Sequence, residues 1–434
     1  MSGGTFLELH PPLTAEEAAV EADRCLECGG QATAPCAAAC PAGVDVPAFI
    51  AGIAADAPGA AARTIFAANL LGGTCARVCP VEELCARGCV LLHDGQPAID
   101  IAGLQRYATD WAYAHGLELR ERAPLTHRKV AVVGAGPAGL AVSGELAALG
   151  HDVTVYDERV LPGGLVRYGI APYRQQEQPL PEEVRLLGLL GVKFRFQCRV
   201  DERLLHRLQR EADAIVLAIG MGGDSDVRYP GDDLGGVWDS LPFIAQLKTG
   251  EPPDVGDRVI VLGGGNTAVD CAVEARRLGA CNVTIAYRRT RAEMPAYAHE
   301  VELAEREGVD FVWLSTPVRM LGRREHVAAV EFQGMRAGAP DKDGRRSVEE
   351  IPGSEYALPT DTVIKAIGQR PRREFVDLID GVCLERGAIV VDERGRTGNP
   401  KVFAAGDAIN GGATVVEAVR GAKVAAAAIH EVLS

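Results

Sequence analysis

Long apolar runs are missing from this chain of 434 residues. No stretch reaches the roughly 18 apolar residues that a membrane-spanning helix needs. The first residues, MSGGTFLELHPPLT, lack the basic and apolar segments of a secretory signal. A net charge of −14 argues against a nucleic-acid partner. We therefore expect a cytoplasmic protein that binds neither membrane nor nucleic acid, in a reducing compartment where disulfides are rare.

Cysteine, by contrast, is concentrated at one end of the chain, where eight of the twelve lie before residue 90. The first four follow Cys-x2-Cys-x7-Cys-x3-Cys-Pro, and the next four form Cys-x3-Cys-Pro and a second Cys-x3-Cys. Thiolates are the preferred ligands of iron–sulfur clusters, and a run ending in Cys-x3-Cys-Pro is typical of bacterial ferredoxins. The pattern predicts two [4Fe–4S] clusters with interleaved ligands. The eight residues are Cys25, Cys28, Cys36, Cys40, Cys75, Cys79, Cys85 and Cys89.

Zinc is the main alternative metal that these thiols could bind. Zinc ribbons use two Cys-x2-Cys pairs, whereas this chain has a single such pair. A zinc-binding helical scaffold without enzymatic activity is therefore the competing hypothesis from another functional class. The remaining cysteines are scattered, and we expect them to serve as packing residues. They are Cys198, Cys271, Cys281 and Cys383.

The chain changes character near residue 125. Before it, helix signals dominate: Thr14 and Glu17 match a capping box, Asp45 suits a second helix start, and Asp100 suits a helix running to Gly116. After a linker at 120–128, short apolar runs alternate with glycine loops and amphipathic helices, which is typical of α/β folds. The predicted fold is an α-helical ferredoxin-like N-terminal domain followed by two Rossmann-like dinucleotide-binding domains, the second inserted in the first. The predicted bounds are 1–125, then 126–223 with 366–434, and 224–365.

The first glycine loop follows an apolar run at 130–133 and reads Gly134-x-Gly136-x-x-Gly139. Glycines there allow a tight turn and close approach of a pyrophosphate to the helix N-terminus. A second apolar run ends at Asp157, which is placed to accept from ribose hydroxyls. The pattern predicts a dinucleotide site. Its expected contacts are Gly134, Gly136, Pro137, Ala138, Gly139 and Asp157.

The second glycine loop has an alanine at its final small position and a basic pair where an acid is usual. Without that carboxylate nothing holds a ribose 2′-hydroxyl, whereas two guanidiniums suit a 2′-phosphate. This favours NADPH over NADH, and the alternative is a solvated basic strand end. The expected contacts are Gly263, Gly265, Asn266, Thr267, Ala268, Arg288 and Arg289.

A third signal lies near the C-terminus. Asp407 follows Gly406 after an apolar run and is placed to hold a ribityl chain or a pyrophosphate. Thr414 suits the start of a helix whose N-terminus would face the anionic edge of a flavin. Apolar runs ending at Gly220 and Gly368 mark the expected crossings between the two domains. Together these features suit one bound flavin and one visiting nicotinamide.

These motifs carry a family resemblance that extends over almost the whole chain. They include CLECGG, TCARVCP, LCARGC, IDIAGLQRYA, GAGPAG, PGGLVRYGI, GGGNTAVD, YRRTRAEMPA and FAAGD. The chain resembles the glutamate synthase small (beta) subunit and the NAD(P)H-oxidising part of dihydropyrimidine dehydrogenase. The resemblance implies FAD at the first loop, with Gly164, Leu165 and Arg167 near it, and NAD(P)H at the second.

The same resemblance implies which side chains bind each cluster. One cluster would take Cys25, Cys28, Cys36 and Cys89, and the other would take Cys40, Cys79, Cys85 and Gln105. Counting thiols alone nominates Cys75 in place of Gln105. The seven-residue spacing between Cys28 and Cys36 is longer than in the family.

The expected activity is NADPH oxidation through FAD, with single electrons passed on by the clusters. This chemistry needs no catalytic side chain; Glu300 either positions the nicotinamide or is a solvated helix residue. Because no FMN barrel, glutaminase half or ferredoxin extension is recognisable, we expect an electron-input subunit. Its partner would be a catalytic subunit containing FMN or iron–sulfur centres, or a ferredoxin-like acceptor. The alternative enzyme is a stand-alone NAD(P)H:ferredoxin-type oxidoreductase.

Overall fold

The computed structural model describes residues 8–29, 33–118, 121–340 and 346–434. It contains two compact units, each assembled from separate stretches of the chain. The cysteine-rich unit comprises Leu9–Arg167, Glu177–Gly222 and Pro371–Ser434, and the inserted unit is built chiefly from Tyr168–Gln176 and Gly223–Arg370. Within the described ranges, none of the helices has both the length and the apolar character that crossing a membrane requires.

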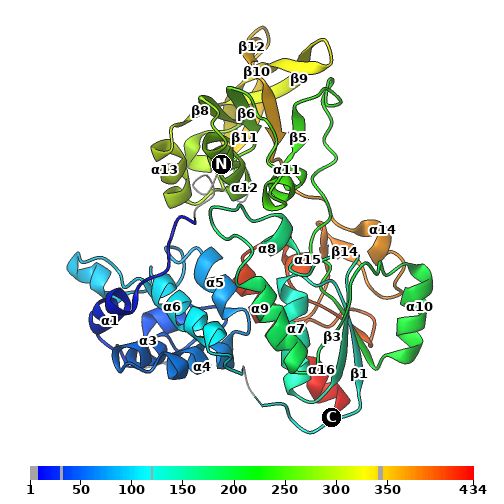
Figure 1. Ribbon diagram of the computed structural model, residues 1–434. Coiled ribbons are helices and arrows are strands. Elements are labelled where there is room, and N and C mark those ends of the chain that lie inside the picture. Colours follow the sequence, from blue (N-terminus) through cyan, green and yellow to red (C-terminus); the bar gives the residue numbers. More distant parts are fainter. Residues whose placement is uncertain (1–7, 30–32, 119–120, 341–345) are drawn as a thin grey trace. The chain divides into compact units, whose positions relative to one another are not determined.

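Short helices form the first part of the cysteine-rich unit (Figure 1). Thr14 and Glu17 make the predicted capping box, and Asp45 and Asp100 each accept a backbone N–H at a helix start. These caps satisfy amides that have no partner within the helix. Phe49 and Phe66 are fully buried between the helices. The elements are α1 (Ala15–Asp23), α2 (Pro35–Ala38), α3 (Val46–Ala54), α4 (Pro58–Ala68), α5 (Gly72–Val78), η1 (Val90–Asp94) and α6 (Ile101–Ala114).

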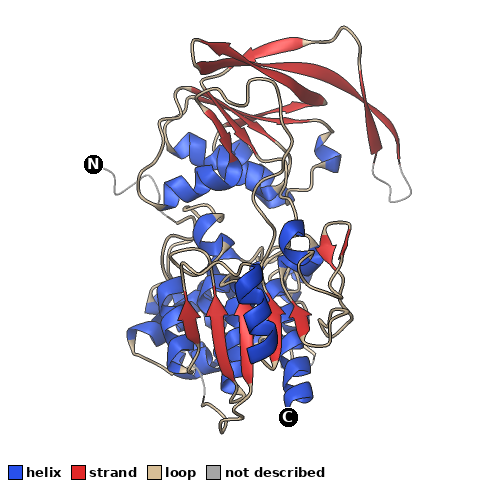
Figure 2. Ribbon diagram, turned by 90° about the vertical axis from the view of Figure 1, so that its right-hand side faces the viewer, coloured by secondary structure: helices blue, strands red, loops and turns tan. Residues whose placement is uncertain are grey.

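A parallel sheet forms the rest of this unit, with strand order β3-β2-β1-β4-β16. Its central strand β1 is apolar almost throughout because helices cover both faces of the sheet (Figure 2). On one face Ala131 and Val133 pack against Leu205 and Leu208 of α10. On the other face α7 packs beside α16. The strands are β1 (Lys129–Val133), β2 (Asp152–Tyr156), β3 (Lys193–Arg195), β4 (Ala214–Leu217) and β16 (Val402–Ala404).

Among the helices of the sheet part, α14 is the first after the inserted unit and α16 is the last of the chain. Thr414 caps the 19-residue α16 through a reciprocal bond with Glu417. The helices are α7 (Pro137–Ala148), α8 (Leu165–Tyr168), α9 (Leu180–Leu189), α10 (Glu202–Glu211), α14 (Arg373–Val376), α15 (Asp407–Asn410) and α16 (Val415–Leu433). A short hairpin, β14 (Leu384–Glu385) and β15 (Ala388–Ile389), lies between α14 and β16.

Polar contacts join the helical part to the sheet part within the cysteine-rich unit. The fully buried Glu183 of α9 accepts from the backbone N–H of Thr74 at 2.8 Å and from its hydroxyl. Tyr113 of α6 donates to the same carboxylate at 3.3 Å. Lys423 of α16 donates to the carbonyls of Ala42 and Ala68 at 2.7 and 2.8 Å. These bonds cross between elements far apart in sequence and fix α5 beside α9 and α16.

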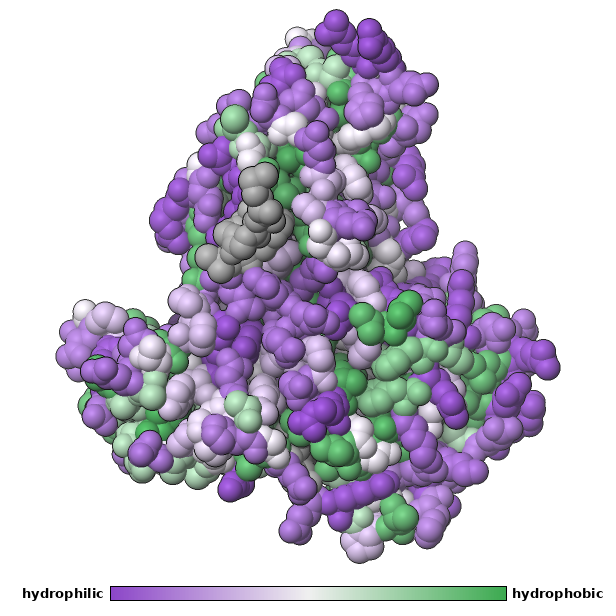
Figure 3. Space-filling model, in the orientation of Figure 1, coloured by the Kyte–Doolittle hydropathy of each residue, from purple (hydrophilic) through white to green (hydrophobic). Residues whose placement is uncertain are grey.

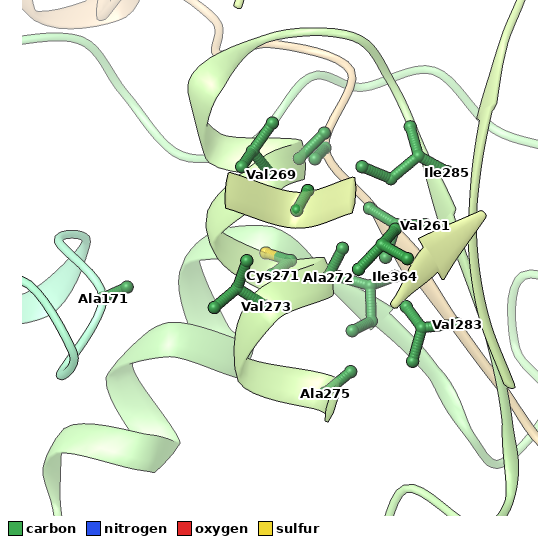
Figure 4. Close-up of a cluster of buried hydrophobic side chains, with 14 of the residues drawn as sticks. Ala171, Val261, Val269, Cys271, Ala272, Val273, Ala275, Val283, Ile285 and Ile364 are labelled. Atoms are coloured by element: carbon green, nitrogen blue, oxygen red, sulfur yellow. The ribbon is translucent and has the colours of Figure 1, made fainter. Parts of the chain in front are cut away.

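The inserted unit repeats the parallel arrangement, with strand order β8-β7-β6-β13-β5. In its core, Val261, Val283 and Ile285 of the sheet face Ala272 and Ala275 of α12 (Figure 4). Ala171, from the short stretch ahead of α9, joins the same core. The elements are β5 (Val237–Asp239), α11 (Ser240–Lys248), β6 (Arg258–Leu262), α12 (Asn266–Arg277), β7 (Asn282–Tyr287), η2 (Arg291–Glu293), α13 (Ala298–Arg306), β8 (Val309–Trp313) and β13 (Thr362–Lys365).

An antiparallel extension lies between β8 and β13 (Figure 2). The long strand β10 pairs with β9, β11 and β12. Val330 and Phe332 of β10 are buried, and they pack with Ile260 and Val363 of the parallel sheet. The extension is therefore anchored to the dinucleotide-type sheet by a shared core. Its strands are β9 (Ser315–Arg323), β10 (His326–Pro340), β11 (Arg346–Glu350) and β12 (Tyr356–Pro359).

Candidate functional site

Four of the eight predicted cluster ligands line a single pocket: Cys25, Cys28, Cys36 and Cys89. They come from the loop after α1, from α2 and from the residue ahead of η1, and apolar side chains such as Ile50 form much of the remaining wall. Burial is the main cause that raises the pKa of Cys25, and it raises that of Cys36 to about 11. A bound metal cation favours the thiolate form of such buried thiols. Four soft donors around a largely apolar pocket fit a [4Fe–4S] cluster.

The other three predicted cysteine ligands, Cys40, Cys79 and Cys85, lie close enough to shift one another's ionisation. A hydrogen bond with the thiol of Cys75, followed by burial, raises the pKa of Cys79 well above its ordinary range. Burial raises the pKa of Cys85 to about 12. Cys75 is therefore a close neighbour of this second set, and its thiol competes with Gln105 for the place of the eighth ligand.

Gln105 is oriented by a hydrogen bond from its own amide. Its Nε2 atom donates to the carbonyl of Gly72 at 2.7 Å, at the first residue of α5. Cys79 caps the other end of α5, and α5 packs against α6, which carries Gln105. Because Nε2 is already bonded, the amide oxygen is the atom available to a metal. The choice between Gln105 and Cys75 as the eighth ligand stays a prediction.

No compact site for a single metal ion is present in the described parts of the chain. Groups of three or more His, Cys, Asp or Glu side chains close enough to hold one ion do not occur there. A cubane cluster separates its ligands more widely, because its own iron and sulfide atoms fill the space between them. Residues 30–32 of the long spacing before Cys36 lie outside the described residues.

The first glycine loop lies between β1 and α7, at the carboxyl ends of the strands where the sheet order reverses. Gly134 has φ +104°, and a Cβ at Gly139 would overlap the Gly134 carbonyl oxygen. Asp157 directly follows β2 and accepts from the N–H of Ala135 at 2.7 Å and of Arg159 at 2.8 Å. Its carboxylate therefore fixes the loop and still has lone pairs for a ribose hydroxyl. The open N-terminus of α7 fits a pyrophosphate.

Other residues predicted near a flavin surround this loop. The N–H of Gly163 donates to the Ala135 carbonyl at 2.7 Å, and Gly164 lies against the backbone of Gly136. Leu165 begins α8, and Arg167 of that helix pairs with Glu177 at 3.2 Å. Gly220 follows β4 with φ +57°. Gly164 therefore lies beside the first loop, although the two are distant in sequence. The helix α8, which carries Leu165 and Arg167, begins directly after Gly164.

The C-terminal residues also reach the first loop. A Cβ at Gly406 would contact Ala138 of α7 at 2.6 Å. Asp407 accepts from the N–H of Ala413 at 3.1 Å, and burial is the main cause that raises its pKa. Thr414 caps α16 immediately afterwards. A carboxylate, a glycine turn and a helix N-terminus thus converge beside α7, which is the donor and acceptor set that a flavin nucleotide needs.

The second glycine loop repeats the geometry of the first in the inserted unit. Gly263 follows β6, and a Cβ there would overlap the carbonyl oxygen of Ala366. Gly265 caps α12, which starts at Asn266, and a Cβ at Gly265 would meet no atom within 4 Å. The side chain of Asn266 accepts from the N–H of Tyr297 at 3.0 Å. Thr267 and Ala268 form the first turn of α12, and Gly368 follows β13 with φ +103°.

The two arginines after β7 have different surroundings. Arg288 is exposed, whereas Arg289 is 8% exposed. Arg289 donates through Nε to the carbonyl of Arg346 at 3.2 Å, and its Nη1 has no hydrogen-bond partner in the described chain. The hypothesis of a solvated basic strand end is therefore wrong for Arg289, because β11 of the antiparallel extension covers it.

No pattern in the sequence predicted a buried ion network next to α12. Arg174 bonds to Asp270 at 2.7 Å and pairs with Glu300 at 2.8 Å, and the Tyr173 hydroxyl donates to Asp270 at 2.6 Å. Glu300 is 4% exposed, so the interpretation as a solvated helix residue is wrong. One signal in the sequence could have predicted this network. Asp270 is an acid in a largely apolar stretch of α12, and a buried carboxylate needs a cation to pair with it.

Glu274 of α12 lies in the same region and is fully buried. One oxygen accepts from the N–H of Tyr173 at 3.0 Å, and the other lacks a hydrogen-bond partner among the described residues. Burial is the main cause that raises the pKa of Glu274 to about 7. In the unfolded chain a glutamate has a pKa of about 4.3. Between about pH 4.3 and pH 7, Glu274 is therefore protonated in the folded protein but ionised in the unfolded chain.

We expect Glu274→Gln to flatten the dependence of thermal stability on pH. For the wild type, the contribution of Glu274 is fully present below about pH 4 and is lost as the pH rises through 7. The amide stays neutral, so the variant should gain up to about 3 kcal/mol over wild type at pH 8. Unfolding midpoints from pH 5 to 8 measure this. The exposed Glu302→Gln is the control, and parallel curves for wild type and Glu274→Gln would contradict the assignment.

The four scattered cysteines only partly match the packing prediction. Cys271 is fully buried in the core beside α12, and Cys198 is half-buried. Cys281 and Cys383 are exposed, so the prediction is wrong for these two. They lie in short connections before β7 and β14, where the chain runs along the surface.

Comparison with known families assigns both parts of the chain. The family described as pyridine nucleotide-disulphide oxidoreductase matches residues 128–422. The family described as dihydropyrimidine dehydrogenase domain II, 4Fe-4S cluster, matches residues 3–117. The first match covers the two glycine loops and the C-terminal residues, and the second covers the eight clustered cysteines and Gln105.

Individual relatives extend over nearly the whole chain. The glutamate synthase [NADPH] small chain of Halomonas elongata is 34% identical over 95% of this chain and 90% of its own length. The NADP(+)-dependent formate dehydrogenase subunit beta of Moorella thermoacetica is 36% identical over 92% of this chain, but the chain spans only 60% of that relative. Among solved structures, Mycobacterium tuberculosis FprA in complex with NADPH has a TM-score of 0.57 at 20% identity, covering 70% of this chain and 84% of FprA. That likeness shows a shared fold.

Proposed function

The chain belongs to the pyridine nucleotide-disulphide oxidoreductase family, in the group that includes the NADPH glutamate synthase small chains, and from this membership we propose that it is an electron-input subunit. We propose FAD at the first loop, NADPH at the second, and two [4Fe–4S] clusters on the eight ligands. Bound FAD would take a hydride from NADPH and release single electrons to the clusters. The observation that carries this proposal is that the cysteine-lined pocket and the first loop share one compact unit.

In this proposal each stretch of chain has one task. Residues 1–125 hold the clusters, residues 126–223 with 366–434 hold FAD, and residues 224–365 hold the nicotinamide nucleotide. The amides at the start of α7 bind the pyrophosphate, while Asp157 and Asp407 orient sugar hydroxyls. No side chain is required to act as nucleophile, acid or base. The chain's own contribution is to bind and orient the cofactors.

The bonds between the helical part and the sheet part support a rigid electron path. Glu183 ties α5, which is capped at its C-terminus by the proposed ligand Cys79, to α9 of the sheet proposed to hold FAD. Lys423 of α16 holds the stretches that contain Ala42 and Ala68. Because an intramolecular hydrogen bond contributes on the order of 0.5–1.5 kcal/mol net, each of these bonds opposes separation of the two parts. The spacing between the flavin site and the second cluster is thereby maintained.

The helical part is also where we propose that a partner docks. Residues 8–118 contain fourteen acidic side chains, five arginines and no lysine, giving a net charge of −9. Hydrophilic residues cover much of this part on the face seen in Figure 3, while Val20 and Leu26 are more than 60% exposed. A partner that approaches the first cluster is therefore expected to present a basic surface. We place this assembly in the cytoplasm.

Cofactor analysis and steady-state assays test the proposal. Purified without oxygen, the chain should carry one FAD and about eight iron and eight sulfide. It should oxidise NADPH rapidly with an artificial electron acceptor. With glutamine plus 2-oxoglutarate, or with a pyrimidine, it should consume no NADPH until a partner subunit is added. Stoichiometric zinc with little sulfide would contradict the clusters, and substrate-dependent NADPH consumption by the chain alone would contradict the role as a subunit.

A further inference from the structure

The antiparallel extension brings the backbone of a third arginine, Arg346, next to Arg289. Arg289 is buried, yet its Nη1 atom has no hydrogen-bond partner among the residues described. Buried guanidinium groups are normally satisfied, so an unpaired one at a nucleotide loop points to an anionic ligand. The Nε atom of Arg289 donates to the carbonyl of Arg346, the first residue of β11.

Arg346 itself adds positive charge beside Arg289. Its side chain is exposed. Hydrogen bonds from Thr290 are the main cause that lowers the pKa of Glu293, and the charges of Arg346 and Arg289 lower it further. Both guanidiniums therefore lie near this carboxylate. One carboxylate oxygen of Glu293 accepts hydrogen bonds from the N–H and the hydroxyl of Thr290, at 3.1 and 2.9 Å. The positive charges of Arg289 and Arg346 thus act on one carboxylate.

We propose that Arg346 is a specificity-determining residue that binds the 2′-phosphate of NADPH together with Arg288 and Arg289. This inference rests on the proposed function, since it assumes that the nicotinamide nucleotide occupies the second loop. A phosphate monoester carries a charge of about −1.5 to −2 near neutral pH, which a single guanidinium does not balance. Arg288 and Arg289 follow β7, and Arg346 begins β11, where its carbonyl accepts from Arg289.

The hairpin offers a matched control. Arg336 of β10 lies opposite Glu349 of β11, and the two side chains form an ion pair at 3.0 Å. Arg346 and Arg336 are both exposed arginines of the same hairpin, so the loss of either removes one positive charge from the same surface. The carbonyl of Arg346 accepts a hydrogen bond from Arg289, whereas Arg336 pairs with Glu349. An effect limited to Arg346 therefore reports on the site and not on overall charge.

The test compares NADPH with NADH as donors to the holoprotein, using ferricyanide as acceptor. Arg346→Ala is expected to lower kcat/KM for NADPH about tenfold, because one charge-assisted contact is lost, and to leave NADH unchanged. Arg346→Lys should recover part of the loss, and Arg336→Ala should match wild type for both donors. An equal loss with both donors, or no loss with NADPH, would overturn the proposal.

Direct binding separates this inference from the proposed function. Titration with 2′,5′-ADP and with 5′-AMP reports on the 2′-phosphate without any electron transfer. Arg346→Ala should weaken 2′,5′-ADP about tenfold and leave 5′-AMP unaffected. If wild type used NADH as well as NADPH, the proposed nucleotide preference would fail, and the 2′,5′-ADP titration would still decide the role of Arg346. Equal affinity of wild type and Arg346→Ala for 2′,5′-ADP would reject it.

Discussion

Replacing Cys79 with alanine is expected to remove about four of the roughly eight iron atoms from the anaerobically purified protein. Cys79 ends α5 and lies among the cysteines of the second set. A cube deprived of one thiolate loses both a strong bond and a negative charge that balances its iron. FAD should stay bound, because the loop proposed to hold it lies on the parallel sheet and not among the cysteines. Iron, sulfide and flavin analysis of one preparation measures all three quantities.

Cys75→Ala is the matched variant, one helical turn earlier on α5. Its thiol hydrogen-bonds to that of Cys79, so both substitutions disturb the same place. If Gln105 is the eighth ligand, Cys75→Ala keeps the full iron content, whereas Gln105→Ala alters the spectrum of the second cluster alone. Loss of about four irons from Cys75→Ala with none lost from Gln105→Ala would assign the eighth ligand to Cys75.

Gly139→Ala is expected to lower the FAD content about tenfold or more while the clusters are retained. A Cβ at position 139 would overlap the Gly134 carbonyl oxygen and crowd Ala218. The loop would have to move away from β4, and the amides at the start of α7 would leave the position that suits a pyrophosphate. Reduction of an artificial acceptor by NADPH should fall in proportion to the FAD that is lost.

Gly188→Ala provides the control for this substitution. Gly188 lies in α9 of the same unit, and a Cβ there would meet no atom within 4 Å. Alanine is also the better helix former, so this variant should keep full FAD and equal or greater stability. A Gly139→Ala protein that retained one FAD with wild-type activity would show that the first loop does not hold the flavin.

The sequence by itself determined most of the local structure. Thr14, Asp45 and Asp100 each cap the expected helix, since a capping side chain acts on amides only two or three residues away. Both glycine loops follow a buried parallel strand and precede a helix. The eight cysteines were visible as a set because metal ligation imposes short spacings. Interactions of this kind depend on neighbours in the chain, which a sequence displays directly.

Only the tertiary structure decided which distant groups meet. It placed the backbone of Arg346 against the buried Arg289. It also buried Glu300, because Arg174 from a remote stretch supplies the compensating charge. Partners of this kind are separated by tens or hundreds of residues and carry no shared pattern. Burial, and with it the pKa of a group such as Glu274, depends on everything packed around that group, which no stretch of sequence contains.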